Sequence, residues 1–107
     1  MDTLKKLQGK GIQLSEEDIK VLIDKYGIKE LSVFGSSIRS DFTDKSDIDF
    51  LIEFKNSENI SLFDLIDIQE YLENITKRSV DIVEPASLDN PYRRNAILDS
   101  KEILYVA

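Results

Sequence analysis

The apolar positions of the chain follow helical spacing in some segments and strand spacing in others. Between a capping box at residues 15–18 and a stop at Gly27, apolar residues recur at the i, i+3, i+4, i+7 spacing: Ile19, Leu22, Ile23 and Tyr26. A second helical stripe follows the N-cap residue Ser61 and comprises Leu62, Leu65, Ile66, Leu72 and Ile75. Pro91 predicts the start of a short third helix. Residues 1–14 predict only a frayed helical turn and a loop.

Strand spacing occurs in four short segments, which alternate with the helical ones. We expect strands at residues 30–34, 47–54 and 79–84 and an edge strand at 103–106, with one or two helical turns near residues 37–40. Side chains alternate between the two faces of a strand, so the second strand has one unbroken apolar side: Ile48, Phe50, Ile52 and Phe54. The chain is therefore expected to fold as a single α/β (α+β) domain over residues 1–107.

Composition narrows the function classes. The chain has 107 residues with a formal charge of -7, and it contains neither cysteine nor histidine. The negative charge weakens any proposal of extended nucleic-acid binding. The absence of histidine and cysteine excludes imidazole bases, thiol nucleophiles and ordinary zinc sites. Proton transfer then falls to carboxylates or water.

The sequence also bears on where the protein works. No apolar stretch approaches the roughly 20 residues that a membrane span needs. No signal-peptide pattern follows Met1, and no cysteine framework points to export. We therefore expect a cytoplasmic protein that does not associate with membranes.

Two carboxylates at the start of the second strand are the main chemical signal. Asp47 and Asp49 lie on the face opposite the apolar residues of that strand, and they repel each other unless a cation lies between them. Hard oxygen ligands of this kind suit Mg²⁺ or Mn²⁺. Gly35 and Ser36, at the end of the preceding strand, are typical of a phosphate cradle. The spacing therefore predicts a metal site beside a phosphate site.

Asp81 is a candidate third acid. Val80 and Ile82 share the buried side of the third strand, which leaves Asp81 on the other face. Asp81 completes a cluster of three carboxylates only if its strand pairs with the Asp47 strand in the right register, which the sequence does not specify. The alternative is an acid satisfied by a backbone N–H group or by Arg78.

The other candidate residues also have structural alternatives. Asp47 and Asp49 fit an exposed strand end where paired acids face water. Gly35 fits a plain turn and Ser36 a plain N-cap. Arg39 is as well explained by a surface ion pair as by a phosphate contact.

These residues together resemble a known family. The segments Ser32-Val33-Phe34-Gly35-Ser36, Ser46-Asp47-Ile48-Asp49-Phe50-Leu51-Ile52, Leu62-Phe63-Asp64-Leu65 and Val80-Asp81-Ile82-Val83, with Arg39, are similar to the minimal nucleotidyltransferases (MNT) of the DNA polymerase β superfamily. The likeness is greatest to the MNT antitoxins of HEPN–MNT toxin–antitoxin pairs. Members usually have glycine where this chain has Ser40.

The resemblance implies a polymerase β-like palm, with a mixed sheet of three to four strands packed with helices. It also implies ATP as substrate, two Mg²⁺ ions held by Asp47, Asp49 and Asp81, and a nucleotide site that includes Gly35, Ser36 and Arg39. The implied reaction is transfer of AMP to a tyrosine of a HEPN-type ribonuclease toxin. Two other functions stay open: an antitoxin that acts by binding alone, and a nucleotidyltransferase acting on a small hydroxylated molecule.

Overall fold

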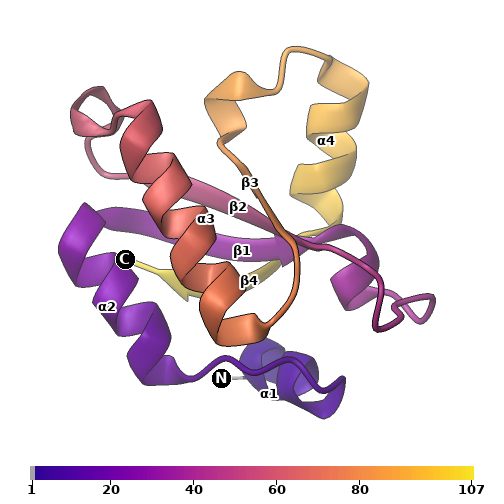
Figure 1. Cartoon of the computed structure of the whole chain (residues 1–107). Coiled ribbons are helices and arrows are strands. Elements are labelled where there is room, and N and C mark those ends of the chain that lie inside the picture. The colour runs from indigo at the N-terminus through magenta and orange to yellow at the C-terminus, as the bar shows by residue number, and fades with distance from the viewer. Residues whose placement is uncertain (1) are drawn as a thin grey trace.

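The computed structural model describes residues 2–107 and shows a sheet packed with helices (Figure 1). Its helices and strands are α1 (Asp2–Gly9), α2 (Glu16–Tyr26), β1 (Ile28–Phe34), η1 (Gly35–Ile38), β2 (Ile48–Phe54), η2 (Ser57–Asn59), α3 (Leu62–Thr76), β3 (Val80–Val83), η3 (Pro85–Ser87), α4 (Pro91–Ser100) and β4 (Glu102–Val106). The expected α/β class is confirmed. Among these residues, no helix is both long enough and apolar enough to cross a bilayer.

The four strands form one mixed sheet in the order β3-β2-β1-β4. β1 pairs antiparallel with both β2 and β4, whereas β2 and β3 run parallel. The expected edge strand at the C-terminus is therefore present. The connection from β2 to the parallel strand β3 passes through α3, as parallel strands require a long crossover.

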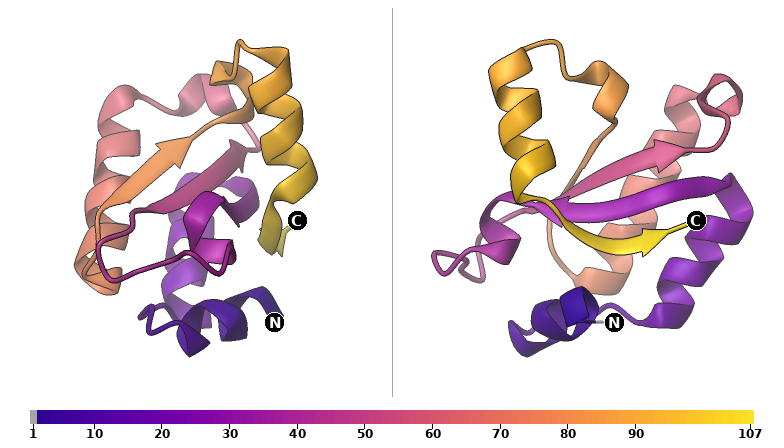
Figure 2. Two further views of the ribbon diagram at one scale, coloured as in Figure 1. Left: turned by 90° about the vertical axis from the view of Figure 1, so that its right-hand side faces the viewer. Right: turned by 180° about the vertical axis from the view of Figure 1, so that it is seen from behind.

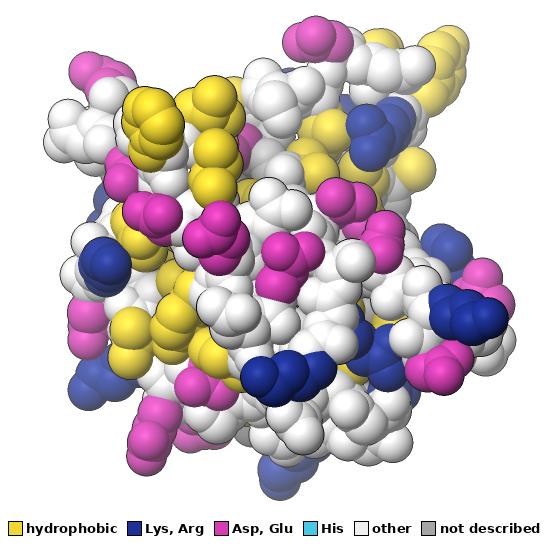
Figure 3. Space-filling view, viewed as in Figure 1, with side chains coloured by type: hydrophobic (Ala, Val, Ile, Leu, Met, Phe, Trp, Pro, Cys, Tyr) yellow, Lys and Arg dark blue, Asp and Glu magenta, His cyan; other side chains and the backbone are white. Residues whose placement is uncertain are grey.

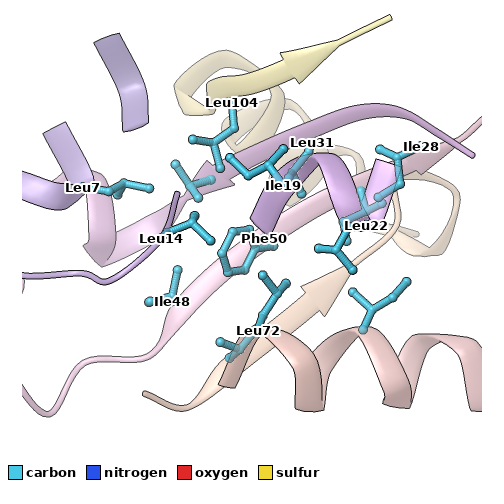
Figure 4. Close-up of a cluster of buried hydrophobic side chains, with 14 of the residues drawn as sticks. Leu7, Leu14, Ile19, Leu22, Ile28, Leu31, Ile48, Phe50, Leu72 and Leu104 are labelled. Carbon is cyan, nitrogen blue, oxygen red and sulfur yellow. The ribbon is translucent and has the colours of Figure 1, made fainter. Parts of the chain in front are cut away.

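The main core lies between one face of the sheet and the helices α1, α2 and α3. Phe50 sits at its centre, surrounded by aliphatic side chains from the strands and helices (Figure 4). Ile48, Phe50 and Ile52 are completely buried, and Phe54 is nearly so. The alternation along β2 thus placed its apolar side correctly.

The opposite face of the sheet is covered mainly by α4. Phe34 and Leu51 of the sheet pack there against Leu88 and Ile97, which form a second, smaller apolar cluster. Seen from behind, α4 stands at one end of this face (Figure 2, right panel). Part of the face is therefore free to carry polar groups.

The three expected helix starts are confirmed: α4 begins at Pro91, and α2 and α3 begin with reciprocal capping boxes. Ser15 accepts from the backbone N–H of Asp18 while the Asp18 carboxylate accepts from the Ser15 N–H, and Ser61 and Asp64 make the same pair of bonds. Gly27 ends α2 in the left-handed conformation with a φ of 67°. These ends are encoded locally, which is why the sequence located them well.

Two sequence-based expectations about helices were wrong. Residues 2–9 form a helix of two turns rather than a frayed one, because Leu4 and Leu7 are buried against the sheet. In α3 the apolar stripe is shifted. Ile68, which the predicted stripe omitted, is completely buried, whereas Leu62 and Ile66 are exposed.

The burial of α1 predicts a stability effect. Leu7→Ala should lower the free energy of unfolding by roughly 2–5 kcal/mol, because it leaves a cavity in the core. Lys5→Ala, on the exposed side of the same helix, should change it by no more than about 0.5 kcal/mol. Urea denaturation of both variants measures the difference. Equal midpoints would show that α1 does not belong to the core.

Candidate active site

Asp49 and Asp81 lie side by side on neighbouring strands. β2 and β3 pair in a register that makes these two residues direct partners, so their side chains share one face of the sheet. The backbone N–H of Ile48 donates to the Ser79 carbonyl at 3.0 Å, which carries the strand pairing back to the start of β2. The register that the sequence left open therefore brings the two acids together.

The electrostatics of Asp49 show that the acids act on one another. Partial burial raises the pKa of Asp49 above its usual value, and the negative charges of Asp81 and Asp47 raise this pKa further. Arg39 acts in the opposite direction, but more weakly. Asp47, immediately before β2, is thus near enough to contribute to the same field. A cation at this position would relieve the repulsion.

Gly35 packs directly against the carboxylate of Asp49. Gly35 has a φ of +72°, a conformation that side chains with a Cβ adopt only with strain. A Cβ added at this position would collide with Oδ2 of Asp49, well inside van der Waals contact distance. Phe34 is the register partner of Asp49 across β1 and β2, which explains the approach. Only glycine fits both the backbone and the space.

The turn after Gly35 is shorter than the sequence predicted. Residues 35–38 form a single 3₁₀ turn, where one or two helical turns were expected near residues 37–40. A turn of this length carries little of the dipole that a long helix would offer a phosphate. The Ser36 hydroxyl lies beside the acids, where it makes a long bond of 3.4 Å to the Asp47 carbonyl. The position of this hydroxyl suits a phosphate donor, and that role of Ser36 stays a prediction.

Arg39 lies at the rim of the site. Its Nε is 3.1 Å from Oδ1 of Asp41, and both side chains are more than half exposed. This ion pair holds the pKa of Asp41 below its usual value. The structure thus places Arg39 in a surface ion pair, although its charge still reaches Asp49. Its role in nucleotide binding stays a prediction.

Two cations support the loop between η1 and β2. The sequence did not single out Lys10, and it offered Arg78 only as a partner for Asp81. The Lys10 ammonium donates to the carbonyls of Ser37 and Arg39, at 2.9 and 2.7 Å. Arg78 donates to the Thr43 carbonyl at 3.0 Å, and its guanidinium lies 4.5 Å from the ring centre of Phe42. These contacts join segments about 30 residues apart, so no local pattern announces them. Lys10 thus fixes the turn that carries Gly35 and Ser36, and Arg78 fixes the loop that follows it.

The acids do not form a ready-made metal cage. Within residues 2–107, no group of three acidic side chains is arranged so that it could hold an ion as it stands. The donor set nevertheless suits a hard cation, since Asp49 already experiences the charge of both neighbouring acids. The metal-binding roles of Asp47, Asp49 and Asp81 therefore stay predictions that the chemistry of the site supports.

The chain combines a mixed sheet, acids on its open face and a Gly-Ser turn beside them. Comparison with known families identifies the class of protein that has this arrangement. The sequence model described as "Nucleotidyltransferase domain" matches residues 16–104. The chain therefore belongs to this family and is a nucleotidyltransferase.

Relatives with assigned names agree. A protein of Methanocaldococcus jannaschii, provisionally named a protein adenylyltransferase, is 37% identical over 81% of this chain and 85% of its own length. The protein adenylyltransferase MntA of Thermococcus cleftensis is 34% identical over 81% of this chain and 83% of its own. The suspected resemblance to minimal nucleotidyltransferases is confirmed.

Solved structures share the fold. A solved structure provisionally described as a minimal nucleotidyltransferase superposes on this chain with a TM-score of 0.67 and 30% sequence identity. The superposition covers 80% of this chain and 85% of the other chain. A toxin-antitoxin crystal structure with AMP-PNP superposes with a TM-score of 0.70 at 18% identity, covering 88% and 75%. At that identity the second likeness concerns the fold alone.

The contact between Gly35 and Asp49 predicts a difference between two glycines. Gly35→Ala and Gly27→Ala both place a Cβ in the left-handed region, at a cost of roughly 1–2 kcal/mol each. Only Gly35→Ala also displaces the Asp49 carboxylate, because nothing lies within 4 Å of a Cβ at Gly27. Gly35→Ala should therefore lose nucleotidyl transfer while Gly27→Ala keeps it. Denaturation curves and labelled-ATP assays measure both effects, and equal activities would contradict the argument.

The raised pKa of Asp49 predicts that its charge costs stability. An acid whose pKa rises on folding is fully destabilising well above that raised pKa, and the cost disappears as the pH falls to the ordinary value of 3.8. In EDTA at about pH 7, Asp49→Asn should therefore unfold at higher urea than the parent, with an advantage that shrinks towards about pH 4. Asp44→Asn, in an exposed loop, controls for net charge. A less stable Asp49→Asn protein at neutral pH would contradict the prediction.

Proposed function

We propose that the chain is a protein adenylyltransferase that uses Mg-ATP to transfer AMP to a tyrosine of a HEPN-type ribonuclease toxin and thereby acts as its antitoxin. The observation that carries the chemistry is the pairing of Asp49 with Asp81, next to Gly35. The named protein adenylyltransferases among the relatives support the choice of a protein acceptor.

The reaction is an in-line displacement at the α-phosphorus of ATP. A bond forms between the acceptor hydroxyl oxygen and this phosphorus, the bond to the bridging oxygen of the β-phosphate breaks, and pyrophosphate leaves. Asp81 is exposed at the surface of the site and takes the hydroxyl proton. Asp47, Asp49 and Asp81 would hold Mg²⁺, whose charge, when bound, offsets that of the phosphates.

The remaining groups of the site bind and orient the nucleotide. The Ser36 hydroxyl donates to a phosphate oxygen, and the left-handed Gly35 lets the backbone turn close beside Asp49. Lys10 and Arg78 keep this turn and the following loop in place from outside. Placement and charge account for most of the proposed rate acceleration, since the protein forms no covalent intermediate.

Exposure of the acids suits an acceptor that belongs to another folded protein. Asp47 and Asp81 are both exposed, and Asp49 is half-buried. A tyrosine on a partner surface can therefore reach this face from solvent. The charge of -7 further favours a partner more basic than the chain itself.

A second function, inhibition by binding alone, is favoured by one observation. The absence of a preformed group of three acids within residues 2–107 is what an inactive site would also show. Adenylyl transfer and inhibition by binding differ in their product, because only transfer increases the mass of the toxin by AMP.

Removal of the Asp47 carboxylate should abolish AMP transfer without preventing the chain from binding its partner. Asp47→Asn should abolish AMP transfer, because loss of a direct metal ligand should cost more than the roughly 10–100-fold typical of outer-shell changes. Asp47 is exposed, so the fold and partner binding should persist. The candidate toxin is the product of the gene next to the one that encodes this chain. Intact-mass spectrometry of that protein, after incubation with this chain and Mg-ATP, measures AMP transfer.

Asp44→Asn is the matched control, because it removes one exposed acid without touching the site. The parent and this control should both add AMP to a partner tyrosine, and Asp47→Asn should not. A partner that the parent inhibits stoichiometrically without any gain in mass would identify a binding-type antitoxin instead.

A further inference from the structure

Three large apolar side chains are exposed together at the start of α3. The exposed fractions of Leu62, Phe63 and Ile66 are 70%, 78% and 40%. They are neighbours on the helix surface, because residues three and four positions apart lie one above the other. Figure 3 shows hydrophobic side chains gathered over this end of α3, at the upper left, with acidic side chains directly below them. We call these three residues the α3 patch.

The residues of the α3 patch belong to neither apolar cluster of the chain. The core side of α3 is supplied by Ile68 and Leu72, which are completely buried. The capping box that starts the helix uses only Ser61 and Asp64. Grouped and exposed apolar side chains of this size mark interaction sites more often than scattered single ones do.

A groove with acidic residues continues from the α3 patch. It lies between α2 and α3 and has a volume of about 320 Å³. Its lining includes Val21 and Tyr71, the acids Asp67 and Glu70, and one cation, Lys25. Val21 is itself 51% exposed. Asp67 and Glu70 follow Phe63 and Ile66 by four positions, so the acids border the patch on the same helix face.

The groove and its border carry more acidic than basic side chains, because Asp67 and Glu70 outnumber Lys25. None of the ion pairs found within residues 2–107 involves Asp67 or Glu70. A second copy of the chain would bring the same acids, and a net charge of -7, against them. A partner surface with apolar residues flanked by lysine or arginine would complement both the patch and its acidic border.

We propose that the α3 patch and the adjoining α2–α3 groove form the docking surface for the protein partner, through a basic amphipathic segment of that partner. The proposal rests on the proposed function in taking the AMP-accepting protein as this partner. The α3 patch belongs to the helix layer, whereas Asp49 and Asp81 lie on the opposite face of the sheet. Docking and catalysis therefore use different residues and can be tested separately.

The first test compares two exposed aromatic residues. Phe63→Ser should weaken binding of the neighbouring-gene product about 30-fold, the fold-change that corresponds to the roughly 2 kcal/mol of a hot-spot residue. Tyr92→Ser, on α4, should leave it unchanged, although Tyr92 is 86% exposed. Both variants should stay folded by circular dichroism, because neither side chain is in the core. Surface plasmon resonance with the purified partner measures the dissociation constants.

The second test concerns charge. Glu70→Lys should slow association and reduce its dependence on salt, because the acid steers a basic partner. Asp99→Lys, an equal charge change at an exposed site on α4, should have a smaller effect. Equal effects of the two variants would show that only net charge matters and would overturn the assignment of the groove.

The outcomes distinguish docking from catalysis. Unchanged binding by Phe63→Ser, or the absence of any complex with the parent chain, overturns the docking surface. Dimerisation of the parent that Phe63→Ser abolishes would identify a second copy as the occupant instead, again overturning the proposal. Failure of AMP transfer by the parent, with binding still lost in Phe63→Ser, would contradict the proposed function but support the docking surface.

Discussion

The alternation of side chains along β2 is the constraint on which both the core and the candidate site depend. One face of this strand contributes Ile48, Phe50 and Ile52 to the core, and the other carries Asp49. A slip of one residue in pairing would exchange these two sets of side chains. It would bury a carboxylate and expose three large apolar groups, at a cost that strongly favours the observed register. The same packing that stabilises the sheet therefore directs the acids to the open face.

The parallel pairing of β2 with β3 brings a second acid next to Asp49. It places Asp81 beside Asp49 and leaves the second acid exposed. Partial burial raises the pKa of Asp49, and repulsion by Asp81 raises this pKa further. Gly35 then approaches so closely that no Cβ would fit. The arrangement is unfavourable for folding alone, since it concentrates negative charge around a half-buried group. A cation bound between the acids would relieve this repulsion, which is the physical reason for the proposed metal site.

The helices cover the two faces of the sheet to different extents. α4 partly covers the acidic face and leaves the acids accessible, while α1, α2 and α3 close the core on the other side. The outer face of α3 is unusual for a covering helix, because it begins with exposed leucine, phenylalanine and isoleucine rather than with polar residues. The acidic face, which we propose for chemistry, and the α3 patch, which we propose for a partner, are thus separate surfaces of one small domain.

Features with local signals were predictable from the sequence. The capping boxes at Ser15 and Ser61 and the buried face of β2 depend on residues a few positions apart, and all were located correctly. The sequence also identified Asp47, Asp49, Asp81 and Gly35 as the residues to examine, through their spacing and family resemblance. The roles of these residues in metal and nucleotide binding stay predictions.

Only the tertiary structure decided how distant segments meet. It set the register of Asp49 with Asp81, brought Lys10 to the turn after Gly35, and buried Leu7 so that α1 forms a full helix. It also rotated α3 so that Ile68 enters the core and Phe63 faces solvent. Helical spacing shows that a helix has an apolar stripe, but the orientation of that stripe depends on which neighbours are available to bury it. The sequence by itself thus determined the strands, the helices from α2 onward and the candidate chemistry, whereas packing between elements formed α1 and decided which side chains lie together.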